Sequence, residues 1–137
     1  MIDFNYETSF RLKSEISIAR WIEEVITKEG YELGDVNYIF CDDSYLLDLN
    51  ITYLNHDTLT DIISFDTTSG LCVNGDIFIS IERVADNANF YNVTFEEELH
   101  RVLIHGILHY LGYKDKLESE QLEMTRKENE SLRLLRL

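Results

Sequence analysis

The stretch "TFEEELHRVLIHGILHYLGYKD" (94–115) decides how this chain folds and where its chemistry lies. Thr94 followed three residues later by Glu97 forms a capping box, a pattern that starts helices. Apolar residues then recur at helical spacing as far as Gly112, which is well placed to end the helix. The sequence therefore predicts a helix that begins after Thr94 and a loop that turns back after Gly112.

Two histidines on this helix predict a metal site. His105 and His109 are four residues apart, so both imidazoles lie on one helix face and can reach one cation. Asp115 follows ten residues after His105, on the returning loop, and zinc accepts carboxylate oxygen as well as imidazole nitrogen. Three protein ligands leave one coordination position open, which is typical of catalytic sites with a metal-activated water. The alternative is that Asp115 is a solvated turn residue.

The motif differs from that of the common zinc proteases. Those enzymes carry a glutamate directly after the first histidine as general base, and this chain has Gly106 there, which leaves room beside the first ligand. The residues do not choose the metal, because two histidines and a carboxylate also suit Fe(II), Ni(II) or Mn(II). Lys114 and Lys116 flank the carboxylate and either pair with an anionic substrate or point into solvent.

Composition bounds the possible functions. The chain has 137 residues, of which 45% are apolar, and this suits one domain with one core. The formal net charge of −14 counts against broad nucleic-acid binding, yet six of the twelve basic residues lie between Lys114 and Arg136. Composition alone favours a solvated helix face for that basic segment. We find no signal peptide and no membrane-length apolar run, and we expect a cytoplasmic protein.

The periodicity of apolar residues predicts a mixed α+β domain. Strand-like segments alternate with amphipathic ones but without a regular βαβ repeat, which favours helices packed against a small mixed sheet. The strand-like segments are 2–6, 36–41, 61–66 and 74–81. The predicted helices run from Ser14, as N-cap, to 29, from 43 or 44 to 53, through 83–88, over 94–112 and over 119–135.

The chain resembles the YbeY family of bacterial metal-dependent endoribonucleases. "HGILHYLGYKD" (105–115) is similar to the family signature. "LNITYLNHDTLTDIISF" (49–65) resembles its segment ending in Thr-Asp-x-x-Ser-Phe, and "GDIFIS" (75–80) resembles its Gly-Asp-Ile strand. The three matches keep the family's order, and the family's single-domain layout covers residues 1–137.

The resemblance implies a zincin-like α+β fold, one divalent metal, most often Zn²⁺, and hydrolysis of single-stranded RNA. It also implies maturation of the 3′ end of the small-subunit ribosomal RNA, beside the small ribosomal subunit, with no role for DNA or a membrane. By family position or loop placement, Asp61, Asp76 and His56 are candidates for contacts with the ligand histidines or with the substrate, whereas the general acid and base stay open.

The chain also departs from the family pattern. The usual third histidine is Asp115, the aspartate before it is Lys114, the usual proline before Thr-Asp is Leu59, and a common arginine is Leu54. We therefore keep two rival functions beside the endoribonuclease. One is a non-catalytic ribosome-assembly protein with a structural metal. The other is a metalloprotease, against which Gly106 argues.

Overall fold

The computed structural model describes residues 1–137 and contains four strands and five helices. In chain order these are β1 (Ile2–Tyr6), α1 (Glu15–Lys28), β2 (Glu32–Cys41), α2 (Asp43–Leu54), β3 (Ile62–Asp66), β4 (Cys72–Ser80), α3 (Ile81–Tyr91), α4 (Phe95–Tyr110) and α5 (Glu118–Leu132). The strand order is β1-β2-β4-β3. β1, β2 and β4 run parallel, whereas β3 is antiparallel to β4. The predicted α+β fold with a small mixed sheet is confirmed.

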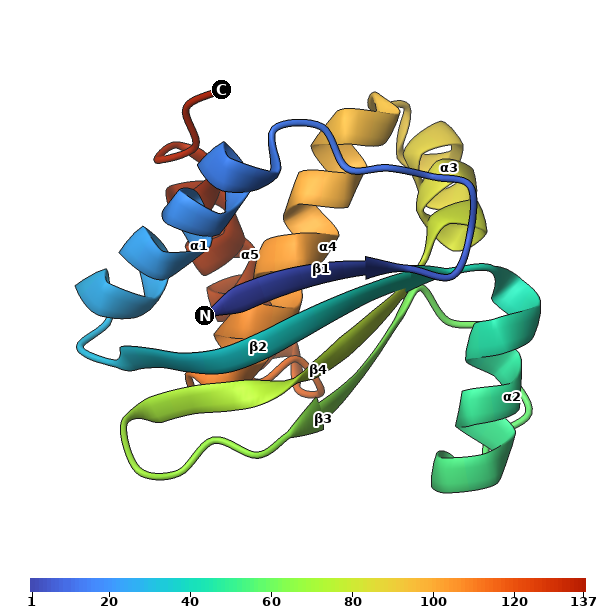
Figure 1. The fold of residues 1–137 in the computed structure, drawn as a ribbon, viewed down its shortest axis with the longest axis horizontal. Coiled ribbons are helices and arrows are strands. Elements are labelled where there is room, and N and C mark those ends of the chain that lie inside the picture. The colour runs from blue at the N-terminus through green and yellow to red at the C-terminus, as the bar shows by residue number, and fades with distance from the viewer.

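The main core lies between one face of the sheet and the helices α1, α4 and α5 (Figure 1). Alternate residues of β2, Val36, Tyr38 and Phe40, are fully buried, as expected for one face of a strand. The Tyr38 hydroxyl donates to the carbonyl of Leu103 on α4 over 2.8 Å, so this face looks toward α4. The central helix is therefore fixed on the sheet by both apolar packing and a buried hydrogen bond.

The helix α2 covers part of the opposite sheet face, at one end of the sheet (Figure 1). A second, smaller core forms there around Cys41, Leu46 and Ile63. Two aromatic contacts extend it, because Tyr45 stacks on Phe78 with ring centroids 6.2 Å apart and Tyr53 meets Phe65 edge-on at 5.8 Å. The sheet is thus covered on both faces, although more thinly on the α2 side.

The last helix is tied to the first by a buried hydrogen bond. The indole Nε1 of Trp21 donates to the backbone carbonyl of Ser131 over 2.7 Å, across 110 residues of sequence. Both residues are buried, at 2% and 4% exposure. This contact closes the core on the side where α1, α4 and α5 meet.

Most predicted elements are found within a few residues of their expected limits, and the differences have local causes. Ser14 precedes α1 but does not cap it, because its backbone is left-handed (φ 60°) and its side chain makes no cap hydrogen bond. The strand predicted over 74–81 ends at Ser80, whose hydroxyl accepts from the Arg83 amide over 3.2 Å and starts α3 at Ile81. No helix of the structure is both long and apolar enough to cross a membrane.

Candidate metal centre

The end of α4 brings the loop back toward the two histidines. Gly112 has φ +98°, and its amide donates to the carbonyl of His109 over 3.0 Å. The Tyr113 amide donates to the carbonyl of Leu108, also over 3.0 Å. This pair of bonds is a Schellman motif, in which the residue after the helix must be left-handed, and glycine adopts that conformation without steric cost. Gly112 therefore directs residues 113–115 back along the helix, as predicted.

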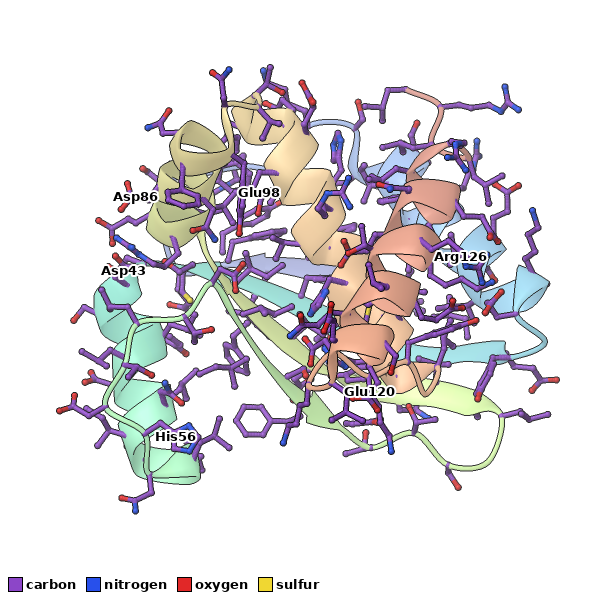
Figure 2. All side chains as sticks on the ribbon, turned by 180° about the vertical axis from the view of Figure 1, so that it is seen from behind. Asp43, His56, Asp86, Glu98, Glu120 and Arg126 are labelled. Atoms are coloured by element: carbon purple, nitrogen blue, oxygen red, sulfur yellow. The ribbon has the colours of Figure 1, made fainter.

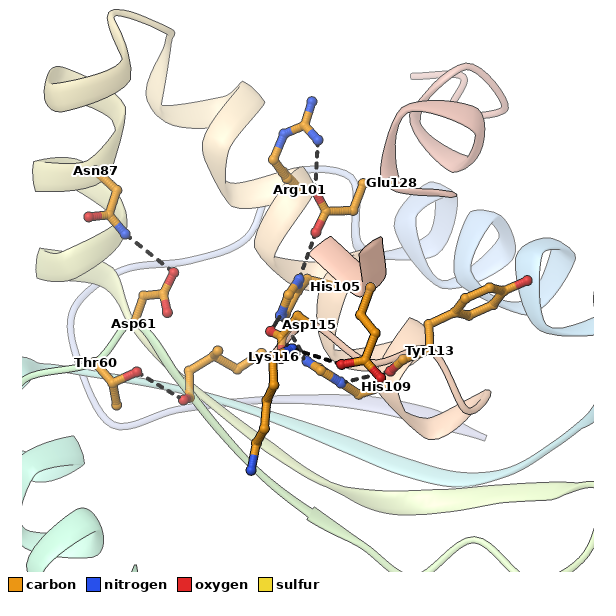
Figure 3. Close-up of polar contacts among 12 residues, drawn as sticks. Thr60, Asp61, Asn87, Arg101, His105, His109, Tyr113, Asp115, Lys116 and Glu128 are labelled. Atoms are coloured by element: carbon orange, nitrogen blue, oxygen red, sulfur yellow. Dashed lines mark hydrogen bonds and ion pairs between the residues drawn. The ribbon is translucent and has the colours of Figure 1, made fainter. Parts of the chain in front are cut away.

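Three side-chain atoms converge at this turn. His105 Nε2 and His109 Nε2 lie 3.0 Å apart, and Asp115 Oδ2 lies 3.3 Å from the first and 3.2 Å from the second (Figure 3). These three residues form a group whose possible ligand atoms all lie within 4.8 Å of one another. The structure thus brings together the three residues that the sequence nominated as metal ligands.

The hydrogen bonds on the far side of each ring fix which nitrogen faces the cluster. The Nδ1 of His109 lies 3.0 Å from the carbonyl oxygen of Tyr113, which can only accept, so Nδ1 carries the proton. The Nδ1 of His105 lies 2.6 Å from Glu128 Oε2, a carboxylate oxygen that accepts in the same way. In neutral imidazoles both Nε2 atoms then present lone pairs to each other and to Asp115. Three facing acceptors repel unless a cation lies among them, so the donor set fits a divalent metal.

Glu128 is the main site residue that sequence reasoning missed. It comes from α5, far along the chain, and is only 7% exposed. One of its oxygens faces His105 and the other accepts from Arg101 Nη1 over 2.8 Å. Burial lowers the pKa of His105, but the hydrogen bond with Glu128 and the charges of Glu128, Asp115 and Asp61 outweigh it, and the net shift is upward. No spacing rule links residue 128 to His105, because the contact depends on how α5 docks on α4.

Asp61 lies at the edge of the centre, just before β3. Its Oδ2 accepts from Asn87 Nδ2 on α3 over 3.3 Å (Figure 3). Burial raises the pKa of Asp61, and this outweighs the lowering by His105 and by the Asn87 hydrogen bond. Asp61 and His105 both line a groove with a volume of about 940 Å³ beside α4, between α3 and α5, which we call the α4 groove. Of the outer candidates, Asp61 is the carboxyl group that the fold brings toward the histidines.

Two other candidates lie away from the centre. Asp76 is exposed on β4, next to buried Ile77, and adjacent strand residues point to opposite faces. Its carboxylate accepts from Asn37 Nδ2 over 3.1 Å, whereas Ile77 faces α4. His56 is exposed in the loop after α2, and Figure 2 places it at the far end of that helix. Neither side chain makes a contact with His105, His109 or Asp115.

Some basic side chains near the centre form ion pairs with glutamates, and others form none. Lys114 and Lys116 flank Asp115, are exposed, and form no ion pair. Arg126 is held by Glu123 and Glu130, and Lys127 by Glu29 at 3.0 Å and by Glu130. Arg101 likewise forms an ion pair with Glu128. The two lysines on the loop are therefore the free positive charges beside the cluster.

Gly106 has a packing role rather than the one expected from the sequence. A Cβ atom built on it would lie 3.0 Å from Ile62 Cδ1 and 3.2 Å from Ile77 Cδ1. The residue after the first histidine therefore faces the sheet, not the ligands, and glycine lets α4 lie close to β3 and β4. A glutamate at this position would meet apolar side chains.

Comparison with known proteins shows relatives that cover nearly the whole chain. Residues 3–136 match the family described as Endoribonuclease YbeY. Two proteins named Endoribonuclease YbeY are similar to this chain. That of Flavobacterium psychrophilum is 57% identical over 134 residues, covering 98% of this chain and 96% of the relative. That of Flavobacterium johnsoniae is 58% identical over 132 residues, covering 96% and 95%.

A solved structure is also similar. The solution structure of TM1509 from Thermotoga maritima matches with a TM-score of 0.69 and 27% identity, over 98% of this chain and 89% of that one. Fold and site together define an α+β domain with a preformed cluster of two histidines and an aspartate that could bind a metal. The chain belongs to the YbeY family of endoribonucleases.

Proposed function

We propose that this chain is a metal-dependent endoribonuclease that cleaves single-stranded RNA, and that residues 1–137 act as one catalytic domain. The observation that carries the proposal is the convergence of His105 Nε2, His109 Nε2 and Asp115 Oδ2, with the outer hydrogen bonds of both imidazoles already made. Family membership supports RNA as the substrate, because the relatives are named endoribonucleases. Zn²⁺ is the proposed ion, since it accepts both nitrogen and carboxylate ligands and keeps an open position with three of them.

A bound ion would supply Lewis-acid activation of the nucleophile and offset charge on the phosphate. The chain's own residues would orient the metal ligands and supply the charged groups around them. Glu128 accepts the Nδ1 proton of His105, which leaves the lone pair of Nε2 facing the cluster. The Tyr113 carbonyl does the same for His109. Asp61, whose Oδ2 accepts from Asn87, is the proposed group for moving a proton at the reacting oxygen. Lys114 and Lys116 are placed to contact the RNA phosphates.

The proposed cellular role is maturation of the 3′ end of the small-subunit ribosomal RNA during ribosome assembly in the cytoplasm, with the small ribosomal subunit as partner. Its support is the family resemblance. The charge pattern is compatible with an RNA that touches the protein locally, because free lysines flank the centre on an otherwise acidic chain.

The test compares His109→Ala with His56→Ala, which removes a histidine that lies outside the cluster. Metal content is measured on the purified proteins, and cleavage is measured on a single-stranded oligoribonucleotide and on its duplex. We expect His109→Ala to lose the metal and the single-strand cleavage, and His56→Ala to keep both. RNA cleavage that survives in His109→Ala contradicts the proposal.

The same proteins separate the rival functions. If the wild type holds metal but cleaves no RNA, the chain is a binding protein with a structural ion. If it cleaves peptides, it is a protease, which the apolar surroundings of Gly106 disfavour because they leave no room for the protease glutamate.

A further inference from the structure

The α4 groove is lined by a carboxylate that has no protein partner and whose oxygens are accessible from the groove. Glu98 lies on α4 and is only 7% exposed, yet its side chain makes no hydrogen bond and no ion pair. Most of the residue is buried, but its carboxylate oxygens are not sealed from solvent, since every fully buried side-chain polar atom in the structure has a hydrogen-bond partner. Figure 2 shows Glu98 between α3 and α4, and its side chain lines the groove. The groove therefore presents a strong, unused acceptor to whatever enters it.

None of the charged groups that face Glu98 pairs with its carboxylate. Asp61 and Glu128 repel its charge, and burial with these neighbours raises the pKa of Glu98 despite opposing effects from Arg101 and His105. Arg101 is already engaged, since its Nη1 donates to Glu128 Oε1 and its Nη2 to Asn129 Oδ1, both over 2.8 Å. A ligand with neutral N–H donors would satisfy Glu98 without displacing that ion pair.

One part of the groove is suited to a flat, apolar group. Val93, Val102, Leu132 and Leu135 line it, and Tyr91 adds an aromatic ring at its rim, 62% exposed. Unpaired RNA bases bind proteins by stacking on such rings while their edges hydrogen-bond to polar side chains. Of the four carboxylates that line the groove, Asp61, Glu97 and Glu128 already accept hydrogen bonds from protein side chains and Glu98 does not. The groove thus combines an apolar wall, an aromatic ring and one carboxylate without a partner, a combination that suits a base.

We propose that the α4 groove binds the base of a nucleotide next to the cleaved phosphodiester, and that Glu98 selects guanine by accepting its N1–H and N2–H donors. This inference rests on the proposed ribonuclease function. His105 lines the same groove, seven residues after Glu98, which is two helical turns or about 10 Å along α4. A phosphate at the metal centre and its neighbouring base at Glu98 thus fit along one helix.

The preference for guanine follows from the donor pattern of each base edge. Guanine offers two adjacent N–H donors, which one carboxylate can accept together. Adenine and cytosine place an acceptor nitrogen beside their amino group, and uracil places its single N–H between two carbonyl oxygens. An ionised Glu98 would therefore meet a repelling lone pair on each of the other three bases. The acidic groove admits the neutral base while the phosphate stays beside Lys116.

The test titrates the full ¹⁵N-labelled chain with GMP, IMP and AMP and follows amide shifts by NMR. IMP keeps N1–H but lacks the N2 amino group. We expect GMP to shift amides of α4 around Glu98 and to bind roughly tenfold more tightly than IMP, as befits a hydrogen bond to a charged group. AMP should bind more weakly still. Equal affinity for GMP and AMP, or shifts confined to residues 105–116, would overturn the inference.

Three variants sharpen the result. Glu98→Gln should abolish the preference for GMP over AMP, while Glu97→Gln should keep it. Glu97 lines the same groove and loses the same charge, but its carboxylate is already bonded to the Thr94 hydroxyl at 3.1 Å. Tyr91→Ala should weaken all three nucleotides by a similar factor, because stacking does not depend on the base. A guanine preference that persists in Glu98→Gln contradicts the proposal.

The outcome is separable from that of the proposed function. Nucleotide binding is read without any cleavage, so RNA hydrolysis with no guanine preference refutes only the base pocket. Guanine binding without hydrolysis refutes only the nuclease. If N-acetyl-arginine amide shifts the groove amides and the nucleotides do not, Glu98 serves a cationic protein side chain and the base pocket is refuted.

Discussion

The carboxylate of Glu128 lies 2.6 Å from the Nδ1 of His105, although the two residues belong to different helices and are 23 positions apart. The contact orients the imidazole and adds negative charge behind a proposed metal ligand. Partners of this kind raise ligand basicity, and their loss commonly lowers metal affinity about 10- to 100-fold.

Glu128→Gln should therefore lower metal affinity by about one to two orders of magnitude while the fold is kept. Competition with a chromophoric chelator measures the affinity, and circular dichroism checks the fold. Glu130→Gln is the matched control, because Glu130 lies on the same helix but pairs only with Arg126 and Lys127. Equal affinities in both variants would show that Glu128 has no effect on the metal.

Asp115 can be distinguished from a solvated turn residue by two substitutions. Asp115→Ala should lose much of the metal, because only two imidazoles remain. Asp115→His should retain it and move the activity–pH profile to lower pH, since a neutral ligand leaves the ion one unit more positive. Elemental analysis and a pH series measure these effects. Full occupancy in Asp115→Ala would assign Asp115 to solvent.

Gly106→Glu, which restores the protease sequence, should destabilise the fold rather than create a protease. The new carboxylate would be buried against Ile62 and Ile77, at a cost of about 3 kcal/mol or more for an unpaired charge. Gly106→Ala is the graded comparison, since its Cβ would make close contacts with the side chains of Ile62 and Ile77 but would bury no charge. Urea denaturation measures both variants. A Gly106→Glu protein as stable as wild type would show that the site has more room.

Glu98→Gln should stabilise the protein increasingly as pH rises. The folded-state pKa of Glu98 is raised, so the folded state favours the protonated carboxyl, and that contribution is lost as pH rises through the folded pKa. The difference between Glu98→Gln and wild type should thus be small below about pH 4 and reach a plateau above the raised pKa. Thermal unfolding in a pH series measures it. A difference that shrinks with rising pH contradicts the raised pKa of Glu98.

The free lysines should carry the salt dependence of RNA binding. Neutralising Lys114 and Lys116 together should reduce the slope of log affinity against log salt by about 0.7 for each phosphate of a single strand that is no longer neutralised. Arg126→Gln should change it little, because Glu123 and Glu130 already hold that guanidinium. Fluorescence anisotropy at several salt concentrations gives the slopes. An unchanged slope in the double lysine variant would place the RNA elsewhere.

The sequence predicted what depends on local spacing. The helix start at Thr94, the turn at Gly112 and the His105–His109 pair all follow from short-range rules, and the structure contains each. The resemblance to the YbeY family is likewise confirmed, because residues 3–136 match the family.

Other features depend on how distant elements pack, and sequence reasoning did not reach them. Glu128 and Glu98 look like ordinary acidic helix residues until α5 and α3 are placed against α4. The ion pairs of Arg101 with Glu128 and of Lys127 with Glu29, at the end of α1, likewise join residues that are far apart in the sequence. The role of Gly106 also needed the sheet, because its neighbours Ile62 and Ile77 come from two strands.

The hydrogen bond from Trp21 to Ser131 has a consequence for biosynthesis. The indole donor is made early during translation, but its acceptor follows 110 residues later and must then leave the ribosomal exit tunnel. Until then α1 cannot bury this side chain without leaving a polar group unsatisfied, at a cost of about 1–3 kcal/mol. We infer that the nascent chain completes its core only after α5 has emerged, as a late step in which α1 and α5 close together.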